Sequence, residues 1–213
     1  MNRRFGIFFV LMAILLSLSC TAGCTSVRTA DTHNTTVAVQ SYNAWVSGQK
    51  EFDREMRSTL ATIGDHVDTY NREIAKDQPD YSLLRENLAR DRQLLDQWGS
   101  GIEYLTVATD HFEQSTTTLR YDNASAPRVK ESLSLMTQYM KVYSIHVSNA
   151  RQHLIEYVNN AEVYIGPDDP DYWNEEYRQD TTKAKDQASA SFAEGDAALR
   201  NITAYAKTVE QLQ

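Results

Sequence analysis

Four side chains have the types and positions that a metal site in a helical protein would need: His66, Asp91, His153 and Asp180. If the chain folds back at its predicted turns, these four residues lie at similar positions along the helix axes. Metal sites in ferritin-like bundles use Glu-x-x-His on two helices. Here the order is reversed, in the His-Leu-Ile-Glu that begins at His153, and both histidines flank the predicted apolar stripes. Histidines on helix flanks seldom converge on a metal, so we predict partly exposed histidines, one edge carboxylate and no metal or other cofactor.

Nucleophilic catalysis has no sequence support. The chain contains neither a Gly-x-Ser-x-Gly elbow nor a glycine-rich phosphate loop. Its two cysteines, Cys20 and Cys24, both lie near the N-terminus, so the folded part has no cysteine for a nucleophile or a thiolate metal site. We therefore predict that the protein is not an enzyme, and a metal-dependent enzyme is the third-ranked alternative.

Two predicted turns carry the same tripeptide, Pro-Asp-Tyr, at residues 79–81 and 170–172. In an up-down-up-down bundle both turns lie at the same end, away from the N-terminus, where acidic and aromatic side chains would meet. The candidate partner-binding tip consists of Asp80, Tyr81, Asp169, Asp171, Tyr172 and Trp173. Aromatic residues are enriched at interface hot spots, but Asp and Pro are also what helix starts require. The alternative to a binding tip is thus helix capping with packing at the end of the bundle.

The elements that would position these residues are long helices, because apolar residues recur at alternating spacings of three and four. The first expected stripe is Tyr42, Val46, Gln49, Asp53, Met56, Leu60, Ile63, Val67, Tyr70 and Ile74. The third is uninterrupted and contains Val129, Leu133, Met136, Met140, Tyr143, Val147, Ala150, Leu154, Tyr157, Ala161 and Tyr164. The second stripe runs from Leu84 to Leu119, and the fourth, with smaller side chains, from Tyr177 to Leu212.

Proline-containing breaks near residues 77–80, 123–127 and 166–170 divide this pattern into segments 37–76, 81–119, 127–165 and 171–212. Similar lengths and short links predict an all-α fold, an elongated up-down-up-down antiparallel four-helix bundle with coiled-coil-like packing. Two long hairpins that dimerise are the alternative. Gly99 and Gly101 would allow a kink in the second helix.

Composition excludes several other classes. Hydrophobic residues make up 41% of the chain, which is too much for a disordered protein, and Gly and Pro number only 8 and 4, which is few for a β-sandwich or barrel. The net charge of −8 disfavours nucleic acid as a partner, because phosphate contacts need a basic face. Asn34, Asn123 and Asn201 begin Asn-x-Ser/Thr sequons, which permit glycosylation without indicating it.

The N-terminal residues have the three-part layout of an export signal. Arg3 and Arg4 precede an apolar run from Phe5 to Leu18, and small or polar residues follow. The run of about 14 residues is too short to cross a hydrocarbon core of about 30 Å comfortably, although an uncleaved anchor helix remains the alternative.

The stretch Thr-Ala-Gly-Cys that ends at Cys24 resembles the lipobox of prokaryotic membrane lipoproteins. Ala22 and Gly23 match its small positions, whereas Thr21 stands where that family prefers Leu, and Cys20 is a weaker second candidate. The resemblance, which covers residues 1–26, implies cleavage before Cys24 and lipid attachment to its thiol. The expected organisation is an export signal over 1–23, a lipidated cysteine with a flexible tether over 24–36, and a bundle over 37–213.

These features together predict an exported protein anchored to the outer face of the cytoplasmic membrane or the cell envelope. Its expected role is that of a structural or protein-interaction element, with a protein partner at the distal tip and the membrane contacted through the N-terminal lipid. The alternative is an extracytoplasmic ligand-binding sensor that works with a separate signalling partner. An apolar internal pocket would favour the sensor.

Overall fold

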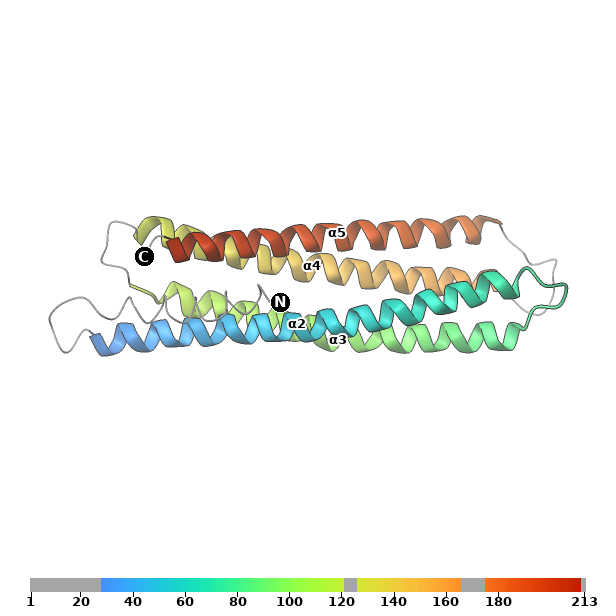
Figure 1. Ribbon diagram of the computed structural model, residues 1–213, viewed down its shortest axis with the longest axis horizontal. Helices are drawn as coiled ribbons and strands as arrows, with labels where there is room; N and C mark the ends of the chain where they lie inside the picture. Colours follow the sequence, from blue (N-terminus) through green and yellow to red (C-terminus); the bar gives the residue numbers. More distant parts are fainter. Residues whose placement is uncertain (1–27, 121–125, 166–174, 212–213) are drawn as a thin grey trace, which may run out of the picture. The chain divides into compact units, whose positions relative to one another are not determined.

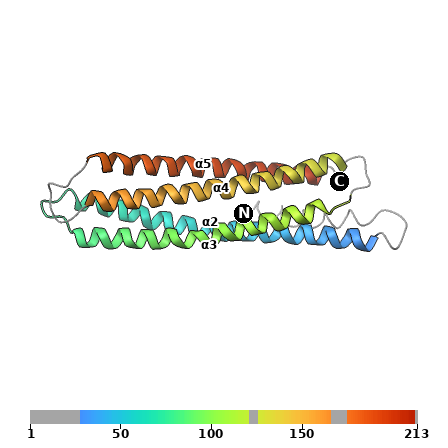
Figure 2. The ribbon, with the colours of Figure 1, turned by 180° about the vertical axis from the view of Figure 1, so that it is seen from behind.

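The computed structural model describes residues 28–120, 126–165 and 175–211. Four α-helices make up nearly all of this part of the chain: α2 (Arg28–Glu73), α3 (Tyr81–Thr117), α4 (Ala126–Ile165) and α5 (Glu175–Gln211). Their succession along the chain is coloured in Figure 1 and seen from behind in Figure 2. The all-α class and the four helices confirm the prediction from the apolar spacing.

The helices contribute to two compact units, each with a segment of all four helices. Unit 1 contains residues up to Gln49, Tyr104–Ser144 and Gly195–Gln213, and unit 2 contains Lys50–Glu103 and Ile145–Glu194. Within each unit the segments form a small four-helix bundle with an apolar interior.

Aromatic side chains fill the interior of unit 1. Trp45 of α2 meets Tyr143 of α4 edge to face, with ring centroids 6.0 Å apart. Tyr42 contacts Phe112 of α3 at 5.8 Å. Ring pairs of this geometry contribute about 0.5–1.5 kcal/mol beyond the area that they bury. The large rings of α2 therefore hold α3 and α4 in unit 1.

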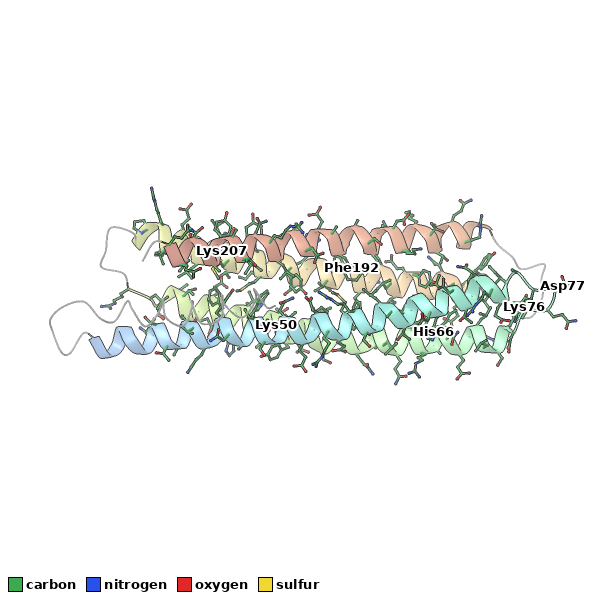
Figure 3. The ribbon with its side chains drawn as sticks, in the orientation of Figure 1. Lys50, His66, Lys76, Asp77, Phe192 and Lys207 are labelled. Carbon is green, nitrogen blue, oxygen red and sulfur yellow. The ribbon has the colours of Figure 1, made fainter. Side chains whose placement is uncertain are left out.

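Unit 2 is built around Trp98 of α3, which is fully buried. Its ring packs against Phe52 of α2 at 5.9 Å and Phe192 of α5 at 6.2 Å, both edge to face. Figure 3 labels Phe192 between the helices. On the surface, Arg92 of α3 donates to Asn159 and Glu162 of α4, at 2.6 Å each. Exposed ion pairs contribute at most about 1 kcal/mol, so the rings hold this unit together.

The expected stripe on α4 is confirmed at every position, because all of its members from Val129 to Tyr164 are buried. The stripe on α2 is only partly correct. Tyr42 and Ile63 are buried as expected, but four other buried residues each lie one position before a predicted one: Trp45, Phe52, Thr59 and Glu73. Ala38 and Val39, which precede the predicted stripe, are buried as well. The larger rings at 45 and 52 take the interior in place of Val46 and Asp53.

Helix α2 also begins at Arg28, nine residues before the expected start, so that residues 28–36 are helical rather than an irregular tether. No Gly or Pro stands between residues 28 and 47 to stop the helix. Extending an existing helix adds one hydrogen bond for each residue fixed, which is easier than starting a new one.

Helix α3 continues through Gly99 and Gly101, since it is assigned as one helix from Tyr81 to Thr117. Gly101 makes room for Phe52. A Cβ at residue 101 would stand 2.5 Å from Cδ2 of that ring, whereas a Cβ at residue 99 would meet only Arg151, at 4.0 Å. The two glycines therefore have different roles, although they are two residues apart.

We expect Gly101→Ala to lower the free energy of unfolding by about 1–2 kcal/mol, because overpacking against a buried ring outweighs the gain of about 1 kcal/mol in helix propensity. Gly99→Ala is the matched control and is expected to raise it by up to about 1 kcal/mol. Urea denaturation followed by circular dichroism measures both. Equal stabilisation by the two substitutions would contradict the close approach of Phe52.

Candidate functional site

A histidine and an aspartate form a direct pair between two helices of unit 2. His66 Nδ1 of α2 lies 2.6 Å from Asp91 Oδ1 of α3. The side chain of Asp91 is 1% exposed and that of His66 is 17% exposed. The contact follows from the side of α2 that is buried. Position 66 lies three residues after Ile63 and seven before Glu73, so His66 is on the same side of the helix as these two buried residues. His66 is partly exposed, as predicted, but its hydrogen bond to the buried Asp91 was not predicted.

Burial dominates the electrostatics of this pair. It raises the pKa of the Asp91 carboxyl above its ordinary value, although the hydrogen bond and charge of His66 and the charge of Arg90 act in the opposite direction. A carboxylate removed from water is costly unless a partner compensates it. His66 supplies that compensation from the neighbouring helix.

Tyrosines surround the pair. Burial, with a smaller contribution from the charge of Asp91, raises the pKa of Tyr157 on α4 to about 12. One turn beyond His66, Tyr70 packs against Tyr164 of α4, with ring centroids 6.1 Å apart. The pKa of Tyr70 is raised by burial first and by Tyr164 and Tyr157 next. The hydroxyls of Tyr157 and Tyr70 thus stay protonated at neutral pH.

The other two candidate metal ligands do not join this pair. His153 Nδ1 lies 3.0 Å from Glu156 Oε2 of its own helix, and Asp180 is exposed on α5. Across residues 28–120, 126–165 and 175–211, no three His, Cys, Asp or Glu side chains gather closely enough to hold a metal ion. The structure therefore brings together His66 and Asp91 alone among these four residues, as a hydrogen-bonded pair between α2 and α3.

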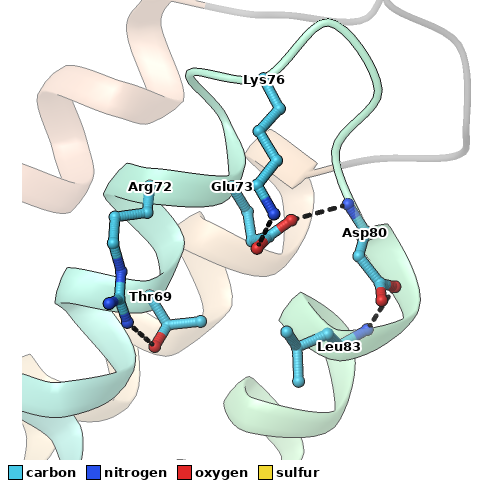
Figure 4. Close-up of polar contacts among 6 residues, drawn as sticks. All are labelled: Thr69, Arg72, Glu73, Lys76, Asp80 and Leu83. Atoms are coloured by element: carbon cyan, nitrogen blue, oxygen red, sulfur yellow. Dashed lines mark hydrogen bonds and ion pairs between the residues drawn. The ribbon is translucent and has the colours of Figure 1, made fainter.

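Two members of the candidate partner-binding tip, Asp80 and Tyr81, lie where α3 begins. Asp80 Oδ1 accepts a hydrogen bond from the Leu83 N–H at 3.0 Å, which is the geometry of a helix N-cap (Figure 4). The carboxylate of Glu73, at the end of α2, accepts hydrogen bonds from Lys76 Nζ at 2.5 Å and from the Asp80 N–H at 3.2 Å. Both bonds keep the pKa of Glu73 below its ordinary value. The carboxylates of Glu73 and Asp80 thus accept hydrogen bonds from the chain's own backbone and from Lys76.

The remaining tip residues, Asp169, Asp171, Tyr172 and Trp173, lie outside the described part of the chain, as does Cys24. Within the described ranges, no helix combines the length and apolar character that crossing a membrane requires.

A small apolar cavity lies within unit 1, with a volume of about 20 Å³. Its walls include Tyr42, Phe112, Leu133, Met136 and Val209, so all four helices contribute. Sites for small molecules usually measure about 300–1,000 Å³. This cavity has room for about one methyl group or water molecule, and its walls are apolar.

Two features were missed in the sequence. Trp45 was not assigned to the stripe of α2, although it is 2% exposed and its indole N–H has no acceptor in the described structure. Its size was the available signal, since the adjacent Val46 fits the same spacing. Tyr104 and Val107 of α3 were also passed over, and each is 49% exposed. Two large apolar residues one turn apart, outside the stripe, were the signal there.

Searches with this chain among protein-family models, curated proteins and solved structures found no match.

Proposed function

We propose that this protein is a lipid-anchored helical-bundle protein of the cell surface that acts as a structural or protein-interaction element. The observation that supports this role is that apolar side chains are exposed on the outside of the protein, where a partner could bind them. The apolar cavity described in unit 1 has a volume of only about 20 Å³, whereas Tyr104 and Val107 stand half-exposed on an outer face of α3. Exposed aromatic and aliphatic residues on a rigid element are typical of protein-binding surfaces.

The sensor alternative would require a pocket for a ligand, and the cavity in unit 1 is more than ten times smaller than the usual size of about 300–1,000 Å³. The His66–Asp91 pair is a chemically distinctive group, but it satisfies itself within the interior of unit 2. We therefore keep the interaction element as the proposal.

The anchor rests on the lipobox-like sequence before Cys24, and it can be tested directly. Cys24→Ala should accumulate as an unprocessed precursor or appear outside the membrane fraction, because the thiol that would carry the lipid is gone. Cys20→Ala is the matched control and should fractionate as the wild type does. Membrane fractionation with immunoblotting measures both location and size. Mature-sized Cys24→Ala protein that stays in the membrane would overturn the anchor.

A further inference from the structure

Two tyrosine rings lie almost parallel where α4 and α5 pack together in unit 1. Tyr139 of α4 and Tyr205 of α5 have ring planes 19° apart and ring centroids 5.8 Å apart. We propose that these two residues are a modification site, at which a one-electron oxidant of the peroxidase type, with hydrogen peroxide, joins the rings by a carbon–carbon bond. The proposal goes beyond the role given above, because it concerns a reaction of the chain itself and does not depend on the anchor.

The geometry brings the edges of the two rings close together. Carbon atoms of packed groups approach each other to about 3.5–4.0 Å. Because the centroids are 5.8 Å apart while the planes are nearly parallel, the rings are displaced sideways, and an edge of one ring lies close to the other. The Cε atoms, which stand beside the carbon that bears the hydroxyl, belong to these edges. A small rotation of either side chain therefore brings one Cε of each ring into contact.

The coupling reaction balances with hydrogen peroxide as the oxidant. Each phenol loses one electron and one proton, and the unpaired electron of the resulting radical is shared with the Cε atoms. The two radicals form one bond between a Cε of Tyr139 and a Cε of Tyr205. The hydrogen on each of these carbons then leaves as a proton, and each phenolic oxygen takes up one proton. The protein thus loses two hydrogen atoms in all, and their electrons and protons reduce one hydrogen peroxide to two water molecules.

Exposure distinguishes this pair from the other tyrosine pair described above. The side chains of Tyr139 and Tyr205 are both partly exposed, so an oxidant and water can reach them. A phenol has an ordinary pKa of about 10, and its oxidation at neutral pH therefore requires that its proton pass to water. In the second pair, Tyr164 is only 8% exposed and burial raises the pKa of Tyr70. The ring centroids are 6.1 Å apart there, a similar distance, but proton loss is harder. The second pair thus serves as an internal control.

The bond reinforces the attachment of α5 to α4. The buried side chains of α5 in unit 1 include Ala198, Ile202, Ala206 and Val209, of which the alanines bury little apolar area. A covalent link between residues 139 and 205 restricts the unfolded chain as a disulfide does, and the long loop that it closes favours a large effect. The cross-linked protein should unfold at a temperature at least about 5 °C higher than the unmodified chain.

Oxidation of the purified full chain tests the proposal. At low protein concentration in detergent, a peroxidase with hydrogen peroxide should give a product of the chain's own mass less two hydrogen atoms, with the blue fluorescence of dityrosine. Mass spectrometry of its digest should show the peptides that contain Tyr139 and Tyr205 joined together. Tyr139→Phe and Tyr205→Phe should each lower this fluorescence at least about fivefold, because phenylalanine keeps the packed ring but has no hydroxyl. Tyr70→Phe is the matched control and should leave the fluorescence unchanged.

Dityrosine fluorescence that persists in Tyr139→Phe, or a bond that maps to another pair, would overturn the proposal. So would products of twice the chain's mass alone, or no product from a chain that keeps its helical circular dichroism spectrum in the oxidant. An unchanged unfolding temperature of the cross-linked product would contradict the reinforcement of α5. The anchor is decided by a separate result, the membrane fractionation of Cys24→Ala.

Discussion

His66→Ala should lower the free energy of unfolding by about 3 kcal/mol at neutral pH, because it leaves the buried Asp91 carboxylate without its partner. The effect should depend on pH. Burial already raises the pKa of Asp91, and loss of the His66 hydrogen bond raises it further. The folded variant therefore binds a proton more tightly than the unfolded chain does, and its penalty relative to the wild type shrinks as pH falls towards the pKa of the folded state.

Asp91→Asn is the control that separates charge from packing. The amide is neutral and similar in shape, and its oxygen can still accept a hydrogen bond from His66, so its cost should stay below about 1.5 kcal/mol. The double variant His66→Ala/Asp91→Asn should be more stable than His66→Ala alone, because no charge is left buried. Urea denaturation between pH 4 and 7 measures all four proteins. A pH-independent penalty for His66→Ala would contradict the role of Asp91 as a buried ion.

Leu154→Asp should abolish cooperative unfolding or lower its free energy by more than about 4 kcal/mol. Leu154 is 6% exposed on α4, and the substitution loses about 2–3 kcal/mol of burial and places an unpaired charge in the interior of unit 2. A total stability of about 5–15 kcal/mol is typical of a domain, so little or none remains.

Gln152→Asp introduces the same residue two positions earlier on the exposed side of α4. It should change the free energy of unfolding by less than about 0.5 kcal/mol. Thermal and urea unfolding followed by circular dichroism compare the two variants. Similar stability of both proteins would show that α4 does not bury the expected side.

Helix α4 illustrates what periodicity alone can predict. Every position of its expected stripe is apolar, and the whole row from Val129 to Tyr164 is buried. On α2 two adjacent rows fit the spacing about equally well. The pairs Trp45/Val46 and Phe52/Asp53 each offer a candidate for one position, and the choice depends on what the opposite helices can accommodate.

The candidate site depended on that choice. Reading Val67 as buried placed His66 on the flank of the helix, whereas burial of Trp45 and Phe52 rotates His66 towards Asp91 of α3. The roles of the two neighbouring glycines were equally hidden, because only the position of Phe52 distinguishes Gly101 from Gly99.

The sequence by itself determined the all-α class, the number of helices and the approximate positions where they end, because spacing and proline act locally along the chain. Tertiary structure alone decided which of two adjacent rows α2 buries, which partner Asp91 finds and which apolar residues stay outside. These outcomes depend on contacts between residues far apart in sequence, such as the 2.6 Å pairing of His66 with Asp91. Large rings occupy the space between the helices, and this packing decides which side of each helix is buried. The polar groups on that side must then form hydrogen bonds with groups on the helix opposite them.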